Sequence, residues 1–143
     1  MHLSQILSHK GSDVVTIRPD ATVLEAIRIL VQRGIGALVV VEEGLPSGIL
    51  TERDVLTFTA GGPALLAHTP VGDVMTRDMV TAGPCDTLAH AMDVMTHRRI
   101  RHLPILQEGD LAGIVSIGDV VNALRVVTAE ENDHLKAYIA SAG

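Results

Sequence analysis

Aromatic residues and cysteine are scarce in this chain, and both scarcities exclude classes of function. Phe58 and Tyr138 are its only aromatic residues, and it has no tryptophan. It therefore lacks the stacking surfaces on which single-stranded nucleic acids bind. One cysteine, Cys85, excludes an internal disulfide and a zinc site built from several thiolates. Such sparse cysteine use fits a reducing compartment, so we expect a cytoplasmic protein.

An excess of positive charge and long apolar segments are also lacking. The formal net charge is −6, which disfavours nucleic acid as a partner. The longest apolar run, Ala37–Val41, is far shorter than the roughly 20 residues of a membrane span. The first residues also lack the apolar core of a secretory signal. We expect a protein that binds neither nucleic acid nor a membrane.

Motifs for metal binding and catalysis are missing as well. The seven histidines do not pair at the short spacing of metal ligands. The sequence contains no Gly-x-Ser-x-Gly motif, no Walker loop and no evident pair of nucleophile and base. We therefore expect no metal site, no catalytic residues and no catalytic cofactor, and hence a protein that is not an enzyme.

What the chain does have is an internal repeat. Residues 14–56 align with residues 79–121 at a constant offset of 65 positions, and 14 of the 43 aligned positions are identical, whereas chance gives about three. Two copies of this length do not make a stacked array. Each half alone is near the size at which a core becomes marginal. We expect the halves to pack around a pseudo-twofold axis and to form two related clefts.

Hydrophobic periodicity predicts the order β-α-β-β-α in each half. The helices are expected to begin at hydroxyl residues that cap helices, namely Thr22, Thr51, Thr87 and Ser116. The expected strands cover residues 14–17, 37–41, 48–50, 79–81, 102–106 and 113–115. A lead-in helix over residues 3–9 and a long C-terminal helix through residue 138 complete a predicted α+β fold. We divide the chain into residues 1–62, with the lead-in helix and first repeat, and residues 63–143, with a linker helix, the second repeat and the C-terminal helix.

Two heptads carry a resemblance to a known family. Gly48-Ile-Leu-Thr-Glu-Arg-Asp54 and Gly113-Ile-Val-Ser-Ile-Gly-Asp119 lie at the same phase of the repeat. They match the Gly-h-x-Ser/Thr-x-x-Asp signature of cystathionine β-synthase (CBS) domains, where h is apolar. The phrase Val71-Gly-Asp-Val-Met-Thr76 is similar to the usual lead-in of such domains. The chain resembles a stand-alone tandem CBS pair, or Bateman module. This resemblance implies a sensor of adenosine-containing ligands such as AMP, ADP, ATP, NAD(H) or S-adenosylmethionine.

The signature residues suit a ribose. A fixed carboxylate accepts hydrogen bonds from two adjacent hydroxyls, and Asp54 and Asp119 lie in the first turn of their helices, where the helix dipole favours negative charge. Thr51 and Ser116, three residues earlier, either cap the helix or reach a ribose or phosphate oxygen. Ser/Thr-x-x-Asp is also a routine capping arrangement, so both interpretations stand at this point.

Adenine needs an apolar slot with backbone hydrogen bonds. The segments expected to form its walls are Val15, Thr16, Val80, Thr81, Ile100 and Ile114. The alternative interpretation is that these residues belong to the core alone.

A phosphate needs cations, and the basic residues are unequally distributed between the repeats. Arg101 and His102 stand where the resemblance implies phosphate-contacting residues, and an arginine fits a phosphate well. Their counterparts in the first repeat are Gly36 and Ala37, whereas Arg53 precedes Asp54. We predict that the Asp119 cleft, lined by Arg101 and His102, binds the phosphorylated ligand more tightly than the Asp54 cleft.

These observations predict a regulatory module. A bound adenine nucleotide is expected to alter the packing of the repeats, of a homodimer or of a regulated partner protein. A homodimer is expected because 47% of the residues are hydrophobic in so short a chain. The alternative is a structural dimerisation module without a nucleotide ligand.

Overall fold

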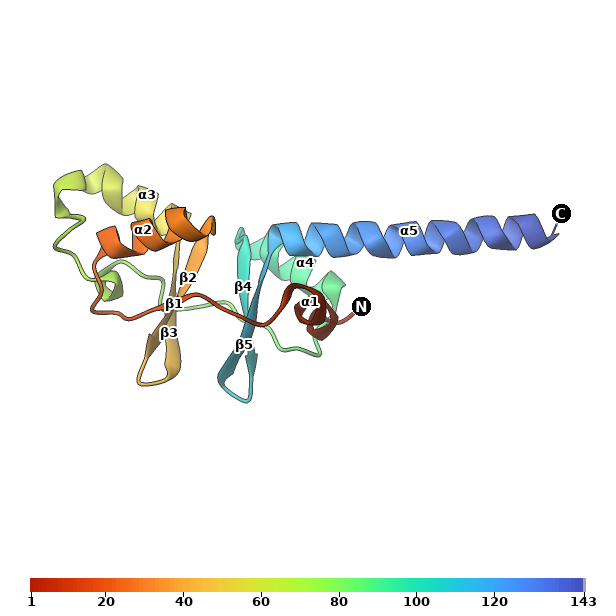
Figure 1. The fold of residues 1–143 in the computed structure, drawn as a ribbon, viewed down its shortest axis with the longest axis horizontal. Coiled ribbons are helices and arrows are strands. Elements are labelled where there is room, and N and C mark those ends of the chain that lie inside the picture. Colours follow the sequence, from red (N-terminus) through yellow and green to blue (C-terminus); the bar gives the residue numbers. More distant parts are fainter. Residues whose placement is uncertain (143) are drawn as a thin grey trace.

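The computed structural model describes residues 1–142, with side chains placed for residues 1–140. Two small αβ units lie side by side, and the last helix projects from the second unit (Figure 1). The elements are α1 (Leu3–Lys10), β1 (Thr16–Ile17), α2 (Val23–Arg33), β2 (Ala37–Glu42), β3 (Leu45–Thr51), α3 (Glu52–Gly61), α4 (Leu88–Arg98), β4 (His102–Gln107), β5 (Asp110–Ser116) and α5 (Ile117–Ala142), with single 3-10 turns at Pro63–Leu65 and Val71–Asp73. This arrangement confirms the predicted α+β fold.

The first repeat forms a three-stranded sheet in the order β1-β2-β3. β1 is parallel to β2, and β2 is antiparallel to β3 through a tight hairpin at Glu43 and Gly44. The strands β2 and β3 are longer than predicted because only these two residues form the turn. Ala26 and Leu30 of α2 pack on the sheet, so the apolar face of this helix and the sheet share one core.

The second repeat has only the β4–β5 hairpin, and the strand predicted over residues 79–81 is wrong. In the first repeat the N–H of Val39 donates to the carbonyl of Val15 at 3.3 Å. The equivalent residue in the second repeat is Pro104, which has no N–H to donate. The pairing is reduced to a single parallel bridge, in which Ala82 and Ile105 are opposed.

The predicted helix caps are present in the structure. The Thr22 hydroxyl accepts from the N–H of Glu25 at 3.1 Å, and the Glu25 carboxylate accepts from the N–H of Thr22 at 2.9 Å. The hydroxyls of Thr51, Thr87 and Ser116 accept in the same way at the starts of α3, α4 and α5. These caps satisfy N–H groups that have no partner inside the helix.

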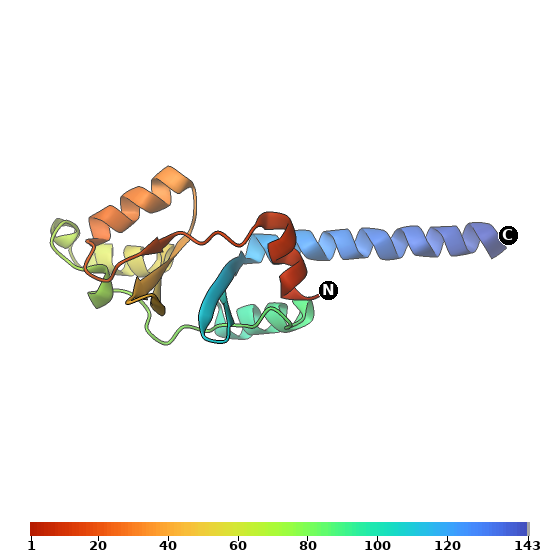
Figure 2. The same cartoon turned by 60° about the horizontal axis from the view of Figure 1, so that its bottom comes forward.

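The segments that precede the two repeats are exchanged between them. α1 precedes the first repeat, yet Leu3, Ile6 and Leu7 are buried in the core of the second. In the turned view α1 lies against the second unit, beside the start of α5 (Figure 2). Conversely, Val71 and Met75 precede the second repeat and are buried in the core of the first. The division between residues 62 and 63 stays a prediction. The structure packs α1, which precedes this division, against the repeat that follows it.

This exchange explains the glycine of each signature heptad. A Cβ added to Gly48 would lie 2.7 Å from the Met75 sulfur and 2.9 Å from the Thr76 carbonyl oxygen, and one added to Gly113 would lie 2.6 Å from Leu7 Cδ2. Both glycines therefore leave room for the exchanged segments to cross their strands.

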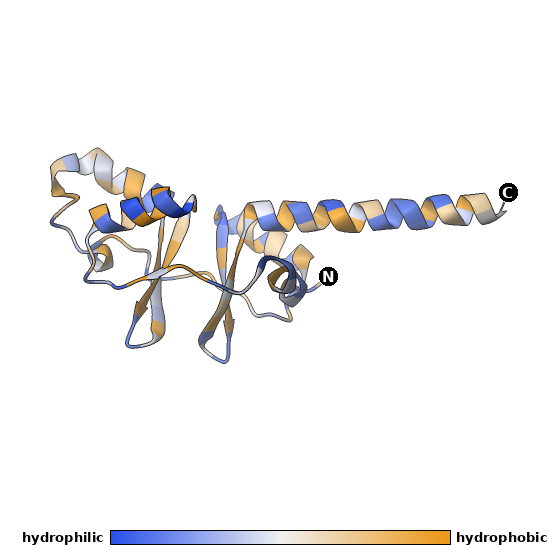
Figure 3. Cartoon of the chain, viewed as in Figure 1, coloured by the Kyte–Doolittle hydropathy of each residue, from blue (hydrophilic) through white to orange (hydrophobic). Residues whose placement is uncertain are grey.

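Beyond the second repeat, α5 is exposed along residues 128–140. Hydrophilic and hydrophobic residues are mixed along this projecting part (Figure 3), and Leu135 and Ile139 are 58% and 62% exposed. Within residues 1–142, no helix combines the length and apolar character needed to cross a membrane.

We expect Gly48→Ala to lower the free energy of unfolding by about 1–3 kcal/mol, since overpacking a close contact carries a cost of this size. Gly61→Ala is the matched control, because a Cβ there meets nothing within 4 Å. Urea denaturation measures both. An unfolding midpoint of Gly48→Ala equal to that of the unmutated protein would contradict the close crossing of the 71–76 segment.

Candidate functional site

A cavity of about 430 Å³ opens between the two repeats, and both of them line it. The first repeat contributes the start of α3, the second contributes the α4–β4 corner, and the chain that connects the repeats contributes Thr76 and residues 78–80. The lining residues are Gly36, Ile49, Thr51, Glu52, Arg53, Asp54, Leu56, Thr76, Asp78, Met79, Val80, Arg98, Arg99, Ile100, Arg101, His102 and Pro104. The cavity therefore exists only while the repeats are packed together.

Hydrogen bonds from Thr51 and Thr76 fix the position of the Asp54 carboxylate in this cavity. Its Oδ2 accepts from the N–H of Thr51 at 3.0 Å and from the Thr51 hydroxyl at 3.1 Å. Its Oδ1 accepts from the Thr76 hydroxyl at 3.2 Å. The Ser/Thr-x-x-Asp pattern thus does form a cap. Because two carboxylate oxygens offer about four acceptor positions, a ligand hydroxyl can still bind to Asp54.

The opposite wall is strongly basic. Arg98 ends α4, Arg99 follows in the left-handed backbone conformation, and Arg101 precedes β4. All three are exposed, as is Arg53 on the other wall. Among the described side chains the ion pairs are Lys10–Asp119 and Arg18–Asp20, so none of these four arginines is paired. An anion entering the cavity would meet unneutralised guanidinium groups.

His102 reaches across from the second repeat to the first. A Cβ on Gly36 would lie 3.0 Å from its Cε1 atom and 3.3 Å from the Glu52 carboxylate. The missing side chain at residue 36 therefore makes room for the imidazole. Burial lowers the pKa of His102 below its ordinary value, and it outweighs the carboxylate of Glu52, which acts in the opposite direction.

The structure corrects the predicted grouping of these residues. Arg101 and His102 line the cavity that contains Asp54, whereas Asp119 is not among its lining residues. The reason is geometric: the corner after the first helix of each repeat faces the other repeat, so the basic residues after α4 meet Asp54 of the first repeat. The predicted ranking, which placed these cations with Asp119, therefore loses its basis.

Asp119 has a different partner. Its Oδ2 accepts from the Lys10 ammonium at 2.7 Å and from the N–H of Ser116 at 2.8 Å, and Lys10 also donates to the carbonyl of Ile114 at 2.9 Å. Burial by itself would raise the pKa of Asp119, but the hydrogen bonds from Lys10 and Ser116 outweigh it and hold the pKa below its ordinary value.

The cavity brings together about half of the predicted site residues. Those inside it are Thr51, Arg53, Asp54, Val80, Ile100, Arg101 and His102. Ser116, Asp119, Ile114, Thr81, Val15 and Thr16 do not line it. Thr16 instead borders a separate surface hollow beside the β2–β3 turn.

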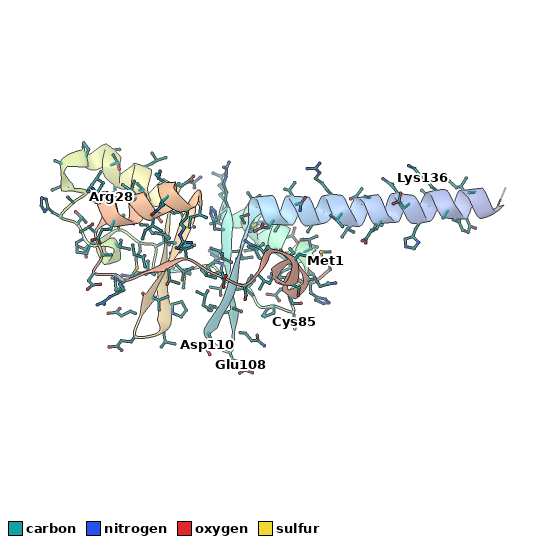
Figure 4. All side chains as sticks on the ribbon, in the orientation of Figure 1. Met1, Arg28, Cys85, Glu108, Asp110 and Lys136 are labelled. Atoms are coloured by element: carbon teal, nitrogen blue, oxygen red, sulfur yellow. The ribbon has the colours of Figure 1, made fainter. Side chains whose placement is uncertain are left out.

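Sequence reasoning missed several lining residues. Arg98 and Arg99 were not among the predicted nucleotide-binding residues, although the cluster of basic residues from His97 to His102 is in the sequence a candidate site for a small anion, with a solvated helix end as the alternative interpretation. Gly36, Thr76 and Asp78 gave no such signal, because their place depends on how the repeats face each other. Cys85 is exposed and lies beside α1, away from the cavity (Figure 4). Within the described residues, no group of three or more His, Cys, Asp or Glu side chains is arranged to hold a metal ion.

Comparison with known proteins identifies the class. The family model of the CBS domain matches residues 4–61 and 71–135. The chain therefore belongs to the CBS domain family and carries two CBS domains in tandem. The crystal structure of the CBS-domain protein ATU1752 from Agrobacterium tumefaciens superposes with a TM-score of 0.83 at 41% identity, covering 86% of this chain and 98% of the other.

Two relatives match this chain over most of their own length. The CBS domain-containing protein YhcV of Bacillus subtilis is 37% identical over 82% of this chain and 84% of its own. The mitochondrial protein CBSX3 of Arabidopsis thaliana is 37% identical over 96% of this chain and 71% of its own, so a cytoplasmic location stays a prediction. An inosine-5'-monophosphate dehydrogenase of Methanocaldococcus jannaschii also matches, but this chain spans only 25% of that enzyme.

Two more distant structures with this fold contain ligands. The CBS domain protein PAE2072 from Pyrobaculum aerophilum is complexed with AMP and superposes with a TM-score of 0.73 at 24% identity, covering 83% of this chain and 89% of the other. The CBS domain pair of protein MJ0100 is complexed with 5'-methylthioadenosine and S-adenosyl-L-methionine, with a TM-score of 0.77 at 24% identity over 87% and 95% of the two chains. At this identity the likeness shows the shared fold.

The pH dependence of stability tests the environment of His102. Because its folded pKa lies below the ordinary value of 6.5, the fold favours the neutral ring. The stability gained in this way is fully present above pH 6.5 and is lost as the pH falls through the folded pKa. We expect thermal denaturation between about pH 7 and pH 5 to show a smaller loss for His102→Gln than for the unmutated protein. His90→Gln, at an exposed helix position, should keep the unmutated slope; equal slopes for all three proteins would contradict the burial effect.

Proposed function

We propose that the protein is a regulatory CBS pair that binds an adenosine-containing ligand, such as AMP, ADP, ATP or NAD(H), in the cavity containing Asp54. The observation that carries this proposal is the joint placement of a hydrogen-bonded carboxylate and several unpaired arginines in one cavity between the repeats. A nucleotide needs both groups, one for its ribose and one for its phosphate.

The lining residues divide into three parts that fit the three parts of a nucleotide. Asp54 accepts from the ribose hydroxyls, with Thr51 and Thr76 orienting its carboxylate. The apolar side chains of Ile49, Leu56, Met79, Val80 and Ile100 form a slot for adenine. Arg101 and His102, with the neighbouring arginines, bind phosphate. The adenosine-containing ligands found in two structures of the same fold support this assignment.

The proposed regulation depends on the fact that residues of both repeats form the walls of the cavity. Because the cavity is built from both repeats, a ligand binds well only to the arrangement that holds them together in this way. It shifts the conformational equilibrium by its difference in affinity for the two arrangements. This shift would change how the chain packs in its own homodimer or against a regulated partner protein.

The second cleft of the pair would be headed by Asp119, with Ser116, Ile114, Thr81, Val15 and Thr16 as its other predicted residues. We propose that Lys10 keeps this cleft closed. The lysine ammonium bonds to the Asp119 carboxylate and the Ile114 carbonyl, which are the groups that a ribose and an adenine would otherwise use. The module then takes one ligand per chain.

A structural dimerisation module is the second candidate. The observation in its favour is α5, whose exposed part carries Leu135 and Ile139. A single helix of this length gains little stability in water without packing. A second copy of the chain along this face would bury its apolar side chains, whether or not a nucleotide is bound. Ligand screening separates the two candidates.

The test is a thermal-shift screen with AMP, ATP, NADH and S-adenosylmethionine, since a specific ligand raises the melting temperature by mass action. We expect Asp54→Ala to lower the affinity for the best ligand at least about tenfold, because hydrogen bonds to a charged group contribute about 1.5–3 kcal/mol. Calorimetry measures the loss.

Asp119→Ala is the matched control. It removes the equivalent carboxylate, which accepts from the N–H of Ser116, but leaves the cavity residues in place. We expect this variant to keep the affinity of the unmutated protein. The assignment is wrong if Asp119→Ala abolishes binding while Asp54→Ala retains it, and a protein that no adenosine compound stabilises supports the structural alternative.

Lys10→Met tests the closed second cleft by removing the ammonium while keeping most of the aliphatic stem. We expect calorimetric titration with ATP to give one ligand per chain for the unmutated protein and two for the variant. Lys136→Met is the control, because Lys136 lies on the projecting part of α5 (Figure 4). Two ligands bound by the unmutated protein, or one by Lys10→Met, would show that Lys10 does not block a site.

A further inference from the structure

We propose that Arg99 is a phosphate-binding residue of the cavity and that, through it, the cavity selects phosphorylated adenosine compounds over uncharged or cationic ones. This inference rests on the proposed function and adds the ligand class to it. It starts from the backbone conformation of Arg99 and from the comparison of the two repeats.

Arg99 occupies a position that favours glycine. It follows α4 with φ 54° and ψ 45°, and its N–H donates to the carbonyl of Met95. The equivalent residue after α2 is Gly34, with φ 63° and ψ 40°. The two backbones have the same left-handed conformation, but only the first repeat has the residue that adopts it without steric cost.

The other non-glycine residues with positive φ behave differently. Glu43 and Glu108 both have φ 53°, and they occupy the same position in the hairpins of the two repeats. There both copies contain the same residue in the same two-residue turn, followed by Gly44 and Gly109. At the end of the helix the copies differ, so the turn itself does not explain the arginine.

The cavity supplies a reason for an arginine there. Arg99 lines it beside Arg98 and Arg101, and none of the three has an ion-pair partner among the described side chains. The carboxylates of Glu52, Asp54 and Asp78 also line the cavity, but none of them forms an ion pair with these arginines among the described side chains, so the guanidinium groups are available to an anion. Gly34 lies outside the cavity, and no cation is required at that position.

The charge of the wall also decides between ligands found in structures of this fold. A phosphate brings negative charge to the three arginines and forms charge-assisted hydrogen bonds with them. Adenosine and 5'-methylthioadenosine bring no charge, and the sulfonium of S-adenosylmethionine brings a positive one. The wall therefore favours AMP, ADP or ATP over these compounds.

The experiment compares Arg99→Gly with the unmutated protein by thermal denaturation and by calorimetric titration. We expect Arg99→Gly to raise the melting temperature of the ligand-free protein by about 3 °C, as relief of a left-handed side chain predicts for a domain of this size. The same variant should bind ATP about tenfold more weakly, while its affinity for adenosine stays within about twofold. Arg99→Lys, which keeps the charge, should recover part of the ATP affinity.

Two controls separate the effects of backbone and charge. Glu108→Gly relieves the same backbone conformation at the tip of the β4–β5 hairpin, far along β4 from the cavity (Figure 4), and should raise the melting temperature without changing ATP affinity. Arg33→Gln removes a positive charge from the corresponding helix end of the first repeat, outside the cavity, and should change neither by much.

The outcomes distinguish this inference from the proposed function. Equal losses of ATP and adenosine affinity in Arg99→Gly, or no loss of ATP affinity, would overturn the role of Arg99 while nucleotide binding stands. If the unmutated protein binds no adenosine compound, the proposed function fails, and inorganic tripolyphosphate becomes the probe. Binding of tripolyphosphate that Arg99→Gly weakens then supports Arg99 as an anion-binding residue; absence of binding to the unmutated protein overturns it.

Discussion

The structure depends on the exchange of apolar segments between the two repeats. Leu3 and Leu7 complete the core of the second repeat, and Val71 and Met75 complete that of the first. Neither repeat buries its own sheet without a segment that precedes the other one. Burial of such side chains stabilises each by roughly 1.5–3 kcal/mol, so the halves are held together by the same contacts that form their cores. Because the chain must cross between the repeats, Thr76 and residues 78–80 line the cavity.

The two signature carboxylates of this repeated fold have different surroundings. Gly36 precedes β2 in the first repeat and Arg101 precedes β4 in the second, and the missing side chain at Gly36 leaves space for His102. One carboxylate, Asp54, faces unpaired arginines, whereas the other, Asp119, is neutralised by Lys10. The two repeats thus share the fold and the caps, while differences at a few loop positions place unpaired arginines beside Asp54 and not beside Asp119.

The sequence was sufficient for the local structure, because local structure depends on residues that are close along the chain. Thr22 and Glu25 predict a capping box, and the box forms. The strand predicted over residues 79–81 failed because Pro104, a residue more than twenty positions away, removes the donor of its ladder. The grouping of Arg101 with Asp119 failed for a related reason: alignment shows which residues are equivalent, but not which surfaces of the two copies face each other. The packing of α1 on the second repeat could not be predicted from the sequence for the same reason.

The connection between cavity and projecting helix can be followed through the backbone. The side chain of Arg101 lines the cavity, while its carbonyl accepts from the N–H of Ile117, the first residue of α5, at 2.8 Å. In the first repeat Gly36 makes the same bond to Glu52 at 3.0 Å, but Gly36 has no side chain with which to hold a ligand. An anion bound to Arg101, as the proposed function requires, would therefore contact a residue that is hydrogen-bonded to the base of α5 and not to the base of α3. Because α5 extends well beyond its repeat (Figure 1), a small rotation at its base would produce a larger displacement at its exposed end.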